Sequence, residues 1–124
     1  MAILENLINL ERVILRSHHT FGRGKTVVTT CLDHKENSRL HASILWNGID
    51  WAIIDHSKNG TWVGQTRLLR GEKTSLKVGD VIYFESDKRR GWEVIDLGAP
   101  TTMLEALQNG REMIPLRQFH ILPD

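Results

Sequence analysis

Apolar and polar residues alternate along most of the chain, in short segments separated by residues that favour turns. A period of two is typical of strands that bury one face, and many short strands with turns between them indicate a sandwich or a barrel. We therefore expect an all-β fold, a two-sheet β-sandwich of about ten or eleven short strands. The clearest strand-like segments are residues 11–16, 27–32, 40–46, 50–55, 62–63, 74–76, 80–84 and 92–97.

Turn-forming residues connect these segments. The pair Asn47-Gly48 lies between two strand-like segments and is the strongest short hairpin signal in the sequence. Clusters of Gly, Asp and Lys at residues 77–80 and 87–91 indicate two further turns. The sequence therefore predicts mostly local, hairpin-like connections.

The alternating pattern weakens near the C-terminus. A short helix over residues 102–108 and a second hairpin around Asn109-Gly110 both remain open, and a strand-like stretch follows at residues 116–122. We expect a sandwich domain over residues 1–98 and a C-terminal extension over residues 99–124. The extension would lead into a further region if the chain is a piece of a longer polypeptide.

Composition narrows the class of partner. The chain has 124 residues and a net charge of +1, which fits one domain with its own core and argues against binding nucleic acid through bulk charge. The basic residues are unevenly spread, however. Residues 16–39 contain five Lys or Arg and three His against two acidic residues. This local excess predicts an anion-binding site.

The single cysteine, Cys31, excludes an intramolecular disulfide and fits a reducing compartment. Because Cys31 follows a β-branched run, we expect a buried, inert thiol. The N-terminus lacks the basic and apolar regions of a signal peptide, and no segment approaches the roughly 18 apolar residues of a membrane span. We therefore expect a cytoplasmic protein that does not bind membranes.

Three polar islands lie beside the ends of predicted strands. They are rich in groups that donate hydrogen bonds to anionic or carbonyl oxygen, and loops on a rigid β scaffold are a common place for a binding surface. A phosphate dianion needs guanidinium, hydroxyl and backbone N–H donors at fixed positions. The islands are Phe21-Gly22-Arg23, Ser38-Arg39-Leu40-His41 and Ser57-Lys58-Asn59-Gly60-Thr61.

These islands, in this order, resemble the signature of the forkhead-associated (FHA) domain family: Gly-Arg, then Ser-x-x-His, then Asn-Gly-Thr. The segment Leu76-Lys77-Val78-Gly79-Asp80-Val81-Ile82 is also similar to that family. The resemblance covers roughly residues 10–97. One departure lies after Asn-Gly-Thr, where the family often continues with Val-Asn-Gly and this chain has Val63-Gly64-Gln65. The missing asparagine puts the geometry of that turn in question.

The resemblance implies a role for each matching residue. Arg23 would neutralise the bound phosphate, Ser38 would donate its hydroxyl to a phosphate oxygen, and Asn59 would bond the peptide main chain. The implied phosphopeptide-binding residues are Arg23, Ser38, Arg39, Lys58 and Asn59. The implied structural supports of the site are Gly22, His41, Gly60 and Thr61. The alternatives without a binding role are that the basic residues are simply solvated and that Asn59-Gly60 only forms a turn.

The function that follows from the resemblance is phosphothreonine-dependent binding of a peptide or protein that is the substrate of a Ser/Thr kinase. A phosphate-independent interaction adaptor is the alternative. We expect no enzyme activity and no cofactor. The histidines lack metal-ligand spacing, and the consecutive residues Asp55-His56-Ser57 cannot orient one another as a triad. The basic residues Arg67, Arg70 and Lys73 are either a solvated hairpin or an extension of the basic surface.

Overall fold

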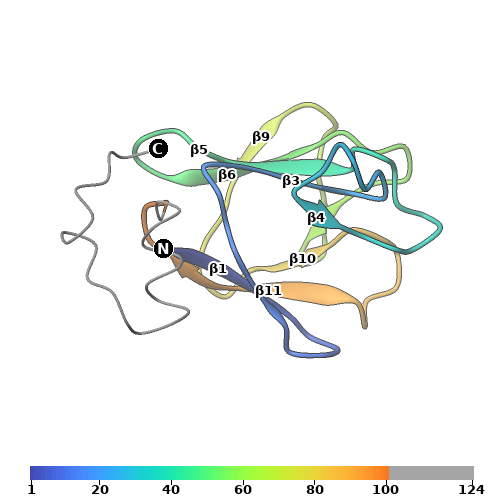
Figure 1. Ribbon diagram of the computed structural model, residues 1–124, viewed down its shortest axis with the longest axis horizontal. Coiled ribbons are helices and arrows are strands. Elements are labelled where there is room, and N and C mark those ends of the chain that lie inside the picture. Colours follow the sequence, from blue (N-terminus) through green and yellow to red (C-terminus); the bar gives the residue numbers. More distant parts are fainter. Residues whose placement is uncertain (101–124) are drawn as a thin grey trace.

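Two β-sheets form the fold in the computed structural model, which describes residues 1–100 (Figure 1). One sheet has six strands in the order β2 (Arg12–Ile14), β1 (Ala2–Asn6), β11 (Gly91–Leu97), β10 (Val81–Tyr83), β7 (Trp62–Val63) and β8 (Thr66–Arg67). The other has five strands in the order β4 (Thr30–Cys31), β3 (His18–Gly22), β5 (Ala42–Trp46), β6 (Trp51–Asp55) and β9 (Lys73–Ser75). Paired strands run antiparallel, except β3 and β4, which are parallel. The predicted all-β, two-sheet sandwich is confirmed.

The core fills the space between the two sheets. Phe21 from β3 stacks on Phe84, which follows β10, with ring centroids 4.9 Å apart, and meets the ring of Trp92 from β11 at 6.4 Å. Ile53 of β6 is fully buried in the same cluster. Each such side chain contributes about 1.5–3 kcal/mol through removal from water. The aromatic cluster therefore fixes the two sheets against each other and holds the loops that leave them.

The predicted hairpin at Asn47-Gly48 is confirmed. Strands β5 and β6 pair along their whole length, and Trp46 lies opposite Trp51 at the turn. The Asn47 side-chain oxygen accepts the backbone N–H groups of Ile49 and Asp50, both at 2.8 Å. Gly48 has a φ of +99°, a conformation that costs glycine little.

Three strands were not predicted. Strands β1, β3 and β8 lie in segments that lack a clear alternation of β-branched residues. Strand β3 contains two histidines and a glycine. It nevertheless pairs with β5 along most of its length and with β4 at its C-terminal end. The strand expected first, at residues 11–16, is the shorter β2 (Arg12–Ile14). It lies at the sheet edge and comes after β1 in the chain. Pairing with neighbours outweighed the weak local preference of these residues.

The prediction of a strand over residues 27–32 and of a buried Cys31 was wrong. Only Thr30–Cys31 forms a strand, and Val27 is 51% exposed in the loop before it. Leu32 takes the inward position, so the alternation of side chains turns Cys31 toward solvent. Strand β4 lies at a sheet edge, where no neighbouring strand covers this thiol.

Within residues 1–100, the structure contains no helix that could cross a membrane. The alternatives of a helix or a hairpin after residue 100, and the strand-like stretch at residues 116–122, lie outside the described residues. The boundary between a domain at 1–98 and an extension at 99–124 stays a prediction.

Candidate functional site

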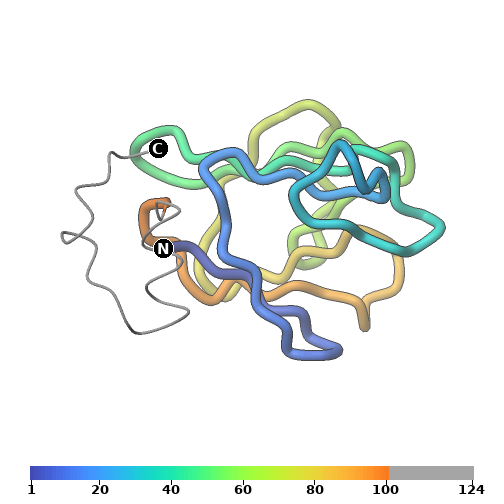
Figure 2. The backbone as a smooth tube through the Cα atoms, in the orientation of Figure 1, coloured from blue at the N-terminus to red at the C-terminus, as the bar shows by residue number. Residues whose placement is uncertain are grey.

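Three loops meet at one end of the sandwich, away from the N-terminus and the β5–β6 turn (Figure 2). They are the segment after β3, the segment between β4 and β5, and the segment between β6 and β7. The backbone N–H of Arg23 donates to the carbonyl of Ser38 at 2.8 Å. The backbone N–H of Lys58 donates to the Ser38 hydroxyl oxygen at 3.0 Å. The polar islands thus form one surface.

The Arg23 guanidinium lies at the edge of this surface. Its Nε donates to the carbonyl of Asn37 at 2.9 Å, which fixes the side chain along the loop between β4 and β5. Its two terminal nitrogens bond no other group in residues 1–100, so their N–H groups remain available to donate side by side to an anion. The Ser38 hydroxyl accepts the bond from Lys58, so its own hydrogen is free to donate. Both side chains therefore keep donors that are free to bond an oxyanion.

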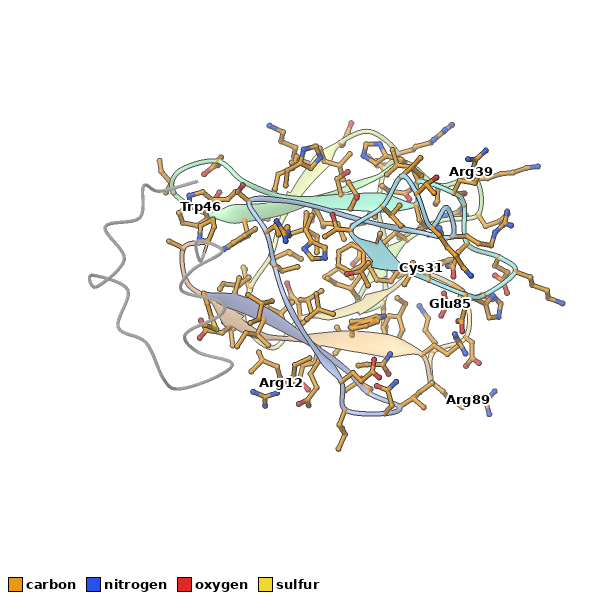
Figure 3. All side chains as sticks on the ribbon, in the orientation of Figure 1. Arg12, Cys31, Arg39, Trp46, Glu85 and Arg89 are labelled. Carbon is orange, nitrogen blue, oxygen red and sulfur yellow. The ribbon has the colours of Figure 1, made fainter. Side chains whose placement is uncertain are left out.

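The Asn59 amide occupies the third side of the surface. Its Nδ2 donates to the carbonyl of Glu36 at 2.9 Å, and this bond ties the β6–β7 loop to the β4–β5 loop. The amide oxygen and the second amide hydrogen remain free to bond a peptide main chain. The exposed Arg39 lies at this end of the molecule, and Trp46 lies at the other end (Figure 3).

The charge of the surface is not compensated internally. The described residues contain four ion pairs, which involve Arg12, Arg89 and Arg90. None of them includes the basic residues of the three loops, which are Arg23, Lys25, Lys35, Arg39 and Lys58. A surface with several unpaired cations attracts an anion, and a phosphate carries about −1.5 to −2 at pH 7.

His41 braces the loops from beneath. The ring is fully buried; its Nδ1 accepts the backbone N–H of Ser38 at 3.0 Å, and its Nε2 bonds the carbonyl of Gly60 at 2.9 Å. An acceptor Nδ1 requires the proton on Nε2, so the ring is neutral. Burial lowers the pKa of His41, and the Gly60 carbonyl, Asp55 and Glu85 oppose this only in part. The two hydrogen bonds of the ring link the β4–β5 loop to the β6–β7 loop, and the structural role of His41 stays a prediction.

Glycine is required at two predicted support positions. A Cβ at Gly22 would overlap the carbonyl oxygen of Arg39, because β3 passes directly beneath that loop. Gly60 has a φ of +111°, and a Cβ there would lie 2.8 Å from the Nε of Arg67. Thr61, the remaining support, is fully buried and donates its hydroxyl to Asp55 at 2.7 Å.

Buried polar residues that sequence reasoning missed hold the loops in place. The Asn37 amide donates to the carbonyl of Phe84 at 3.0 Å and to the Glu85 carboxylate at 2.8 Å, and its oxygen accepts the N–H of His34. Asp55 accepts the N–H of Ser57 as well as the Thr61 hydroxyl. The only local signal was the residue type, because Asn, Asp and Ser often bond nearby backbone in turns.

The consecutive residues Asp55-His56-Ser57 do not form a triad. Asp55 is directed at the Ser57 backbone and at Thr61, whereas the His56 ring bonds the Ser43 hydroxyl at 2.9 Å. Among residues 1–100, no three His, Cys, Asp or Glu side chains are grouped to hold a metal ion. The site consists of hydrogen-bond donors and positive charge.

The departure at Gly64-Gln65 leaves the following turn intact. Val63 pairs with Thr66, so Gly64 and Gln65 form the two-residue loop of the β7–β8 hairpin. Gly64 adopts a φ of +61° and donates its N–H to Val81 at 2.8 Å. Glycine supplies the positive φ that an asparagine also tolerates.

Comparisons with known proteins agree with this geometry. The model of the FHA domain family matches residues 19–85. A protein phosphatase 1 regulatory inhibitor subunit PPP1R8 homolog from Arabidopsis thaliana is 35% identical over an alignment of 83 residues, and the match covers 64% of this chain and 22% of that protein. The chain therefore corresponds to less than a quarter of that relative's length.

Two solved structures share the fold. EmbR of Mycobacterium tuberculosis, in complex with a low-affinity phosphopeptide, is 26% identical with a TM-score of 0.67, over 76% of this chain and 24% of that one. The N-terminal FHA domain of Rad53p from S. cerevisiae, in complex with a phosphothreonine peptide, is 20% identical with a TM-score of 0.64. The match covers 76% of this chain and 90% of that one. The family match covers more than half of the 124 residues. The chain therefore belongs to the FHA domain family, whose members are binding modules.

Proposed function

We propose that this chain binds phosphothreonine-containing peptides or proteins through the surface formed by its three loops. The observation that carries the proposal is the convergence of free donors from separate segments. The Arg23 guanidinium, the Ser38 hydroxyl and the Asn59 amide lie on loops that bond one another directly. FHA domains of the same fold hold phosphopeptides in solved structures, which supports the same use here.

Each residue has a distinct role in this proposal. Arg23 and Ser38 donate to the phosphate oxygens, and the exposed cations Arg39 and Lys58 add charge and further donors around the phosphate. Asn59 bonds the peptide main chain beside the phosphothreonine and sets its direction. Gly22, His41, Gly60 and Thr61 keep the loops at their positions. Hydrogen bonds between ionised partners are stronger than neutral ones, so the phosphate supplies most of the affinity.

Affinity for matched peptides tests the proposal. A library with a fixed phosphothreonine and degenerate flanks selects a peptide, which is then titrated in phosphorylated and unphosphorylated form. Loss of one hydrogen bond to a charged group costs about 1.5–3 kcal/mol, so Arg23→Ala should lower phosphopeptide affinity about 10- to 150-fold. Arg12→Ala is the matched control, because Arg12 lies on β2 and pairs with Glu5. Equal affinity for both peptide forms would favour the phosphate-independent adaptor instead.

Selection of threonine over serine is a separate element of the proposal. A contact with the threonine methyl group would favour phosphothreonine, and the phosphoserine version of the selected peptide should bind more weakly. Equal binding of the two peptides would remove the threonine preference but not the phosphate dependence.

The proposal extends to the class of protein. The domain acts as a binding module without catalytic activity, in the cytoplasm, on substrates of a Ser/Thr kinase. The match to a family of binding modules supports this view, as does the lack, among residues 1–100, of three grouped His, Cys, Asp or Glu side chains that could hold a metal ion. Incubation with the selected phosphopeptide, followed by mass spectrometry, tests it. The peptide should be recovered unchanged, and any turnover would contradict the proposal.

A further inference from the structure

Two arginines border an open pocket that adjoins the three loops. The pocket has a volume of about 610 Å³, and Lys58, Arg67 and Arg70 lie around it. The segment that carries the arginines, residues 67–70, begins in β8 and is fixed at both ends to the residues that flank the β6–β7 loop. Leu68 donates its N–H to Thr61 at 2.9 Å, and Gly71 donates its N–H to Asp55 at 2.9 Å. The arginines are therefore held beside the site by the backbone itself.

Each arginine is oriented by a carbonyl of the β6–β7 loop. Arg67 donates through Nη2 to Asn59 at 3.2 Å, and Arg70 donates through Nη2 to His56 at 3.3 Å. The Arg67 guanidinium also lies 5.6 Å from the Trp62 ring centroid, which restricts it further. A guanidinium has five N–H donors, so most donors of both groups remain free.

No carboxylate within residues 1–100 neutralises these groups. None of the four ion pairs includes Lys58, Arg67 or Arg70. Asp55 is the one acidic residue lining the described pocket, but it is 3% exposed and accepts bonds from Ser57 and Thr61. A pocket with three cations and no free acid favours an anionic occupant.

The pocket adjoins the proposed phosphate site through Lys58. The Lys58 backbone bonds the Ser38 hydroxyl oxygen, and the same residue lines the pocket. Leu69 is 67% exposed and also lines it, so the methylene groups of an acidic side chain have an apolar surface to contact. An extended peptide advances about 3.3 Å per residue, so an anchored phosphothreonine brings residues a few positions away into reach.

We infer that Arg67 and Arg70 form a second anion subsite, which selects peptides carrying an acidic group, a carboxylate or a second phosphate, a few residues from the phosphothreonine. This inference rests on the proposed phosphothreonine binding. It assigns these arginines to recognition of the sequence around the phosphate and leaves the phosphate itself to Arg23 and Ser38.

The test uses phosphothreonine libraries in which one flanking position at a time is fixed as Glu, Gln or phosphoserine. Exposed charge pairs contribute up to about 1 kcal/mol each, so at one position Glu should be preferred over Gln by about fivefold for an arginine that it pairs with closely. Phosphoserine binding better than Glu at that position would identify phosphate as the natural anion, and the reverse would identify a carboxylate.

Variants locate the preference. In the double variant Arg67→Gln/Arg70→Gln, the preference for Glu over Gln in the peptide should fall to less than twofold. Discrimination between phosphothreonine and threonine should be retained. The charge-matched control Arg12→Gln/Lys77→Gln should keep the preference for Glu over Gln. Because Arg67 contacts Gly60, the single variant Arg70→Gln guards against loop damage and should lose at least half of the preference.

Two results would overturn the inference. Phosphothreonine binding with no acidic preference at any position, or with a preference equally weakened in the control variant, refutes the subsite and leaves the proposed function standing. Equal binding of phosphorylated and unphosphorylated libraries by the unaltered chain refutes both.

Discussion

Replacing Gly22 by alanine should disrupt the site through a single methyl group. The new Cβ would overlap the Arg39 carbonyl oxygen and lie 2.9 Å from the Ser38 carbonyl oxygen. Both contacts are backbone atoms, which cannot rotate away as a side chain can. The segment 38–40 must therefore move away from β3, and the bonds from Arg23 to Ser38 and from Gly24 to Arg39 lengthen or break.

The magnitude follows from these contacts. Overpacking of a tight contact costs about 1–3 kcal/mol, and each weakened backbone hydrogen bond costs about 0.5–1.5 kcal/mol. We expect Gly22→Ala to lower the free energy of unfolding by about 2–6 kcal/mol. Because Ser38 moves relative to Arg23, phosphopeptide affinity should fall at least about tenfold, which corresponds to about 1.4 kcal/mol.

Gly48→Ala is the matched control. Unlike Gly22, Gly48 has a positive φ of +99°, and a Cβ there meets nothing within 4 Å. A left-handed alanine costs about 1–2 kcal/mol, so stability should fall while affinity stays unchanged. Urea unfolding gives the stability, and fluorescence anisotropy gives the affinity of the folded fraction. Unchanged phosphopeptide affinity in Gly22→Ala, or an equal loss in Gly48→Ala, would refute the reasoning.

Other features of the structure yield further predictions. Burial, together with Arg16, lowers the pKa of His19 to about 4, and its Nδ1 already accepts the Arg16 N–H. The unfolded chain therefore binds more protons below pH 6.5, so stability should fall by about 3 kcal/mol between about pH 6.5 and pH 4. His19→Gln should flatten that slope in urea unfolding, and an unchanged slope would contradict the assignment. Asn37→Ala leaves the buried Glu85 without its amide partner; it should cost about 1–3 kcal/mol in thermal unfolding and weaken phosphopeptide binding, whereas a variant as stable as the unaltered chain would contradict this role. A chain ending at residue 100 should keep the sandwich and its phosphopeptide affinity, as circular dichroism and anisotropy would show; loss of either would place essential contacts after residue 100.

The strands that the sequence predicted well are those with a clear local pattern of apolar, β-branched and aromatic residues, such as β5, β6 and β11. Strands β5 and β6 are joined by a short turn, so the alternation around Asn47-Gly48 contained both the strands and their pairing. Strand β3 was missed because its polar sequence forms a strand only between β4 and β5. The same dependence on tertiary neighbours explains Cys31, whose exposure follows from the edge position of β4.

The site divides in a similar way. The residues proposed to contact the phosphate, such as Arg23 and Ser38, could be predicted because their order along the chain resembles the FHA signature. Of the residues that position them, Asn37 could not be predicted. Asn37 bonds Glu85 across 48 positions of sequence, and no local pattern marks such a pair. Arg67 and Arg70 were ambiguous until the segment that carries them was seen against the β6–β7 loop.

A titration of the ¹⁵N-labelled chain with the selected phosphothreonine peptide, followed by two-dimensional NMR, tests the central claim most directly. The account predicts that amide signals of Arg23, Ser38, Arg39, Lys58 and Asn59 shift together, that signals in the turn at residues 47–50 do not, and that the unphosphorylated peptide leaves all of them in place. Shifts that gather at the 47–50 turn, or that are the same for both peptides, would contradict it.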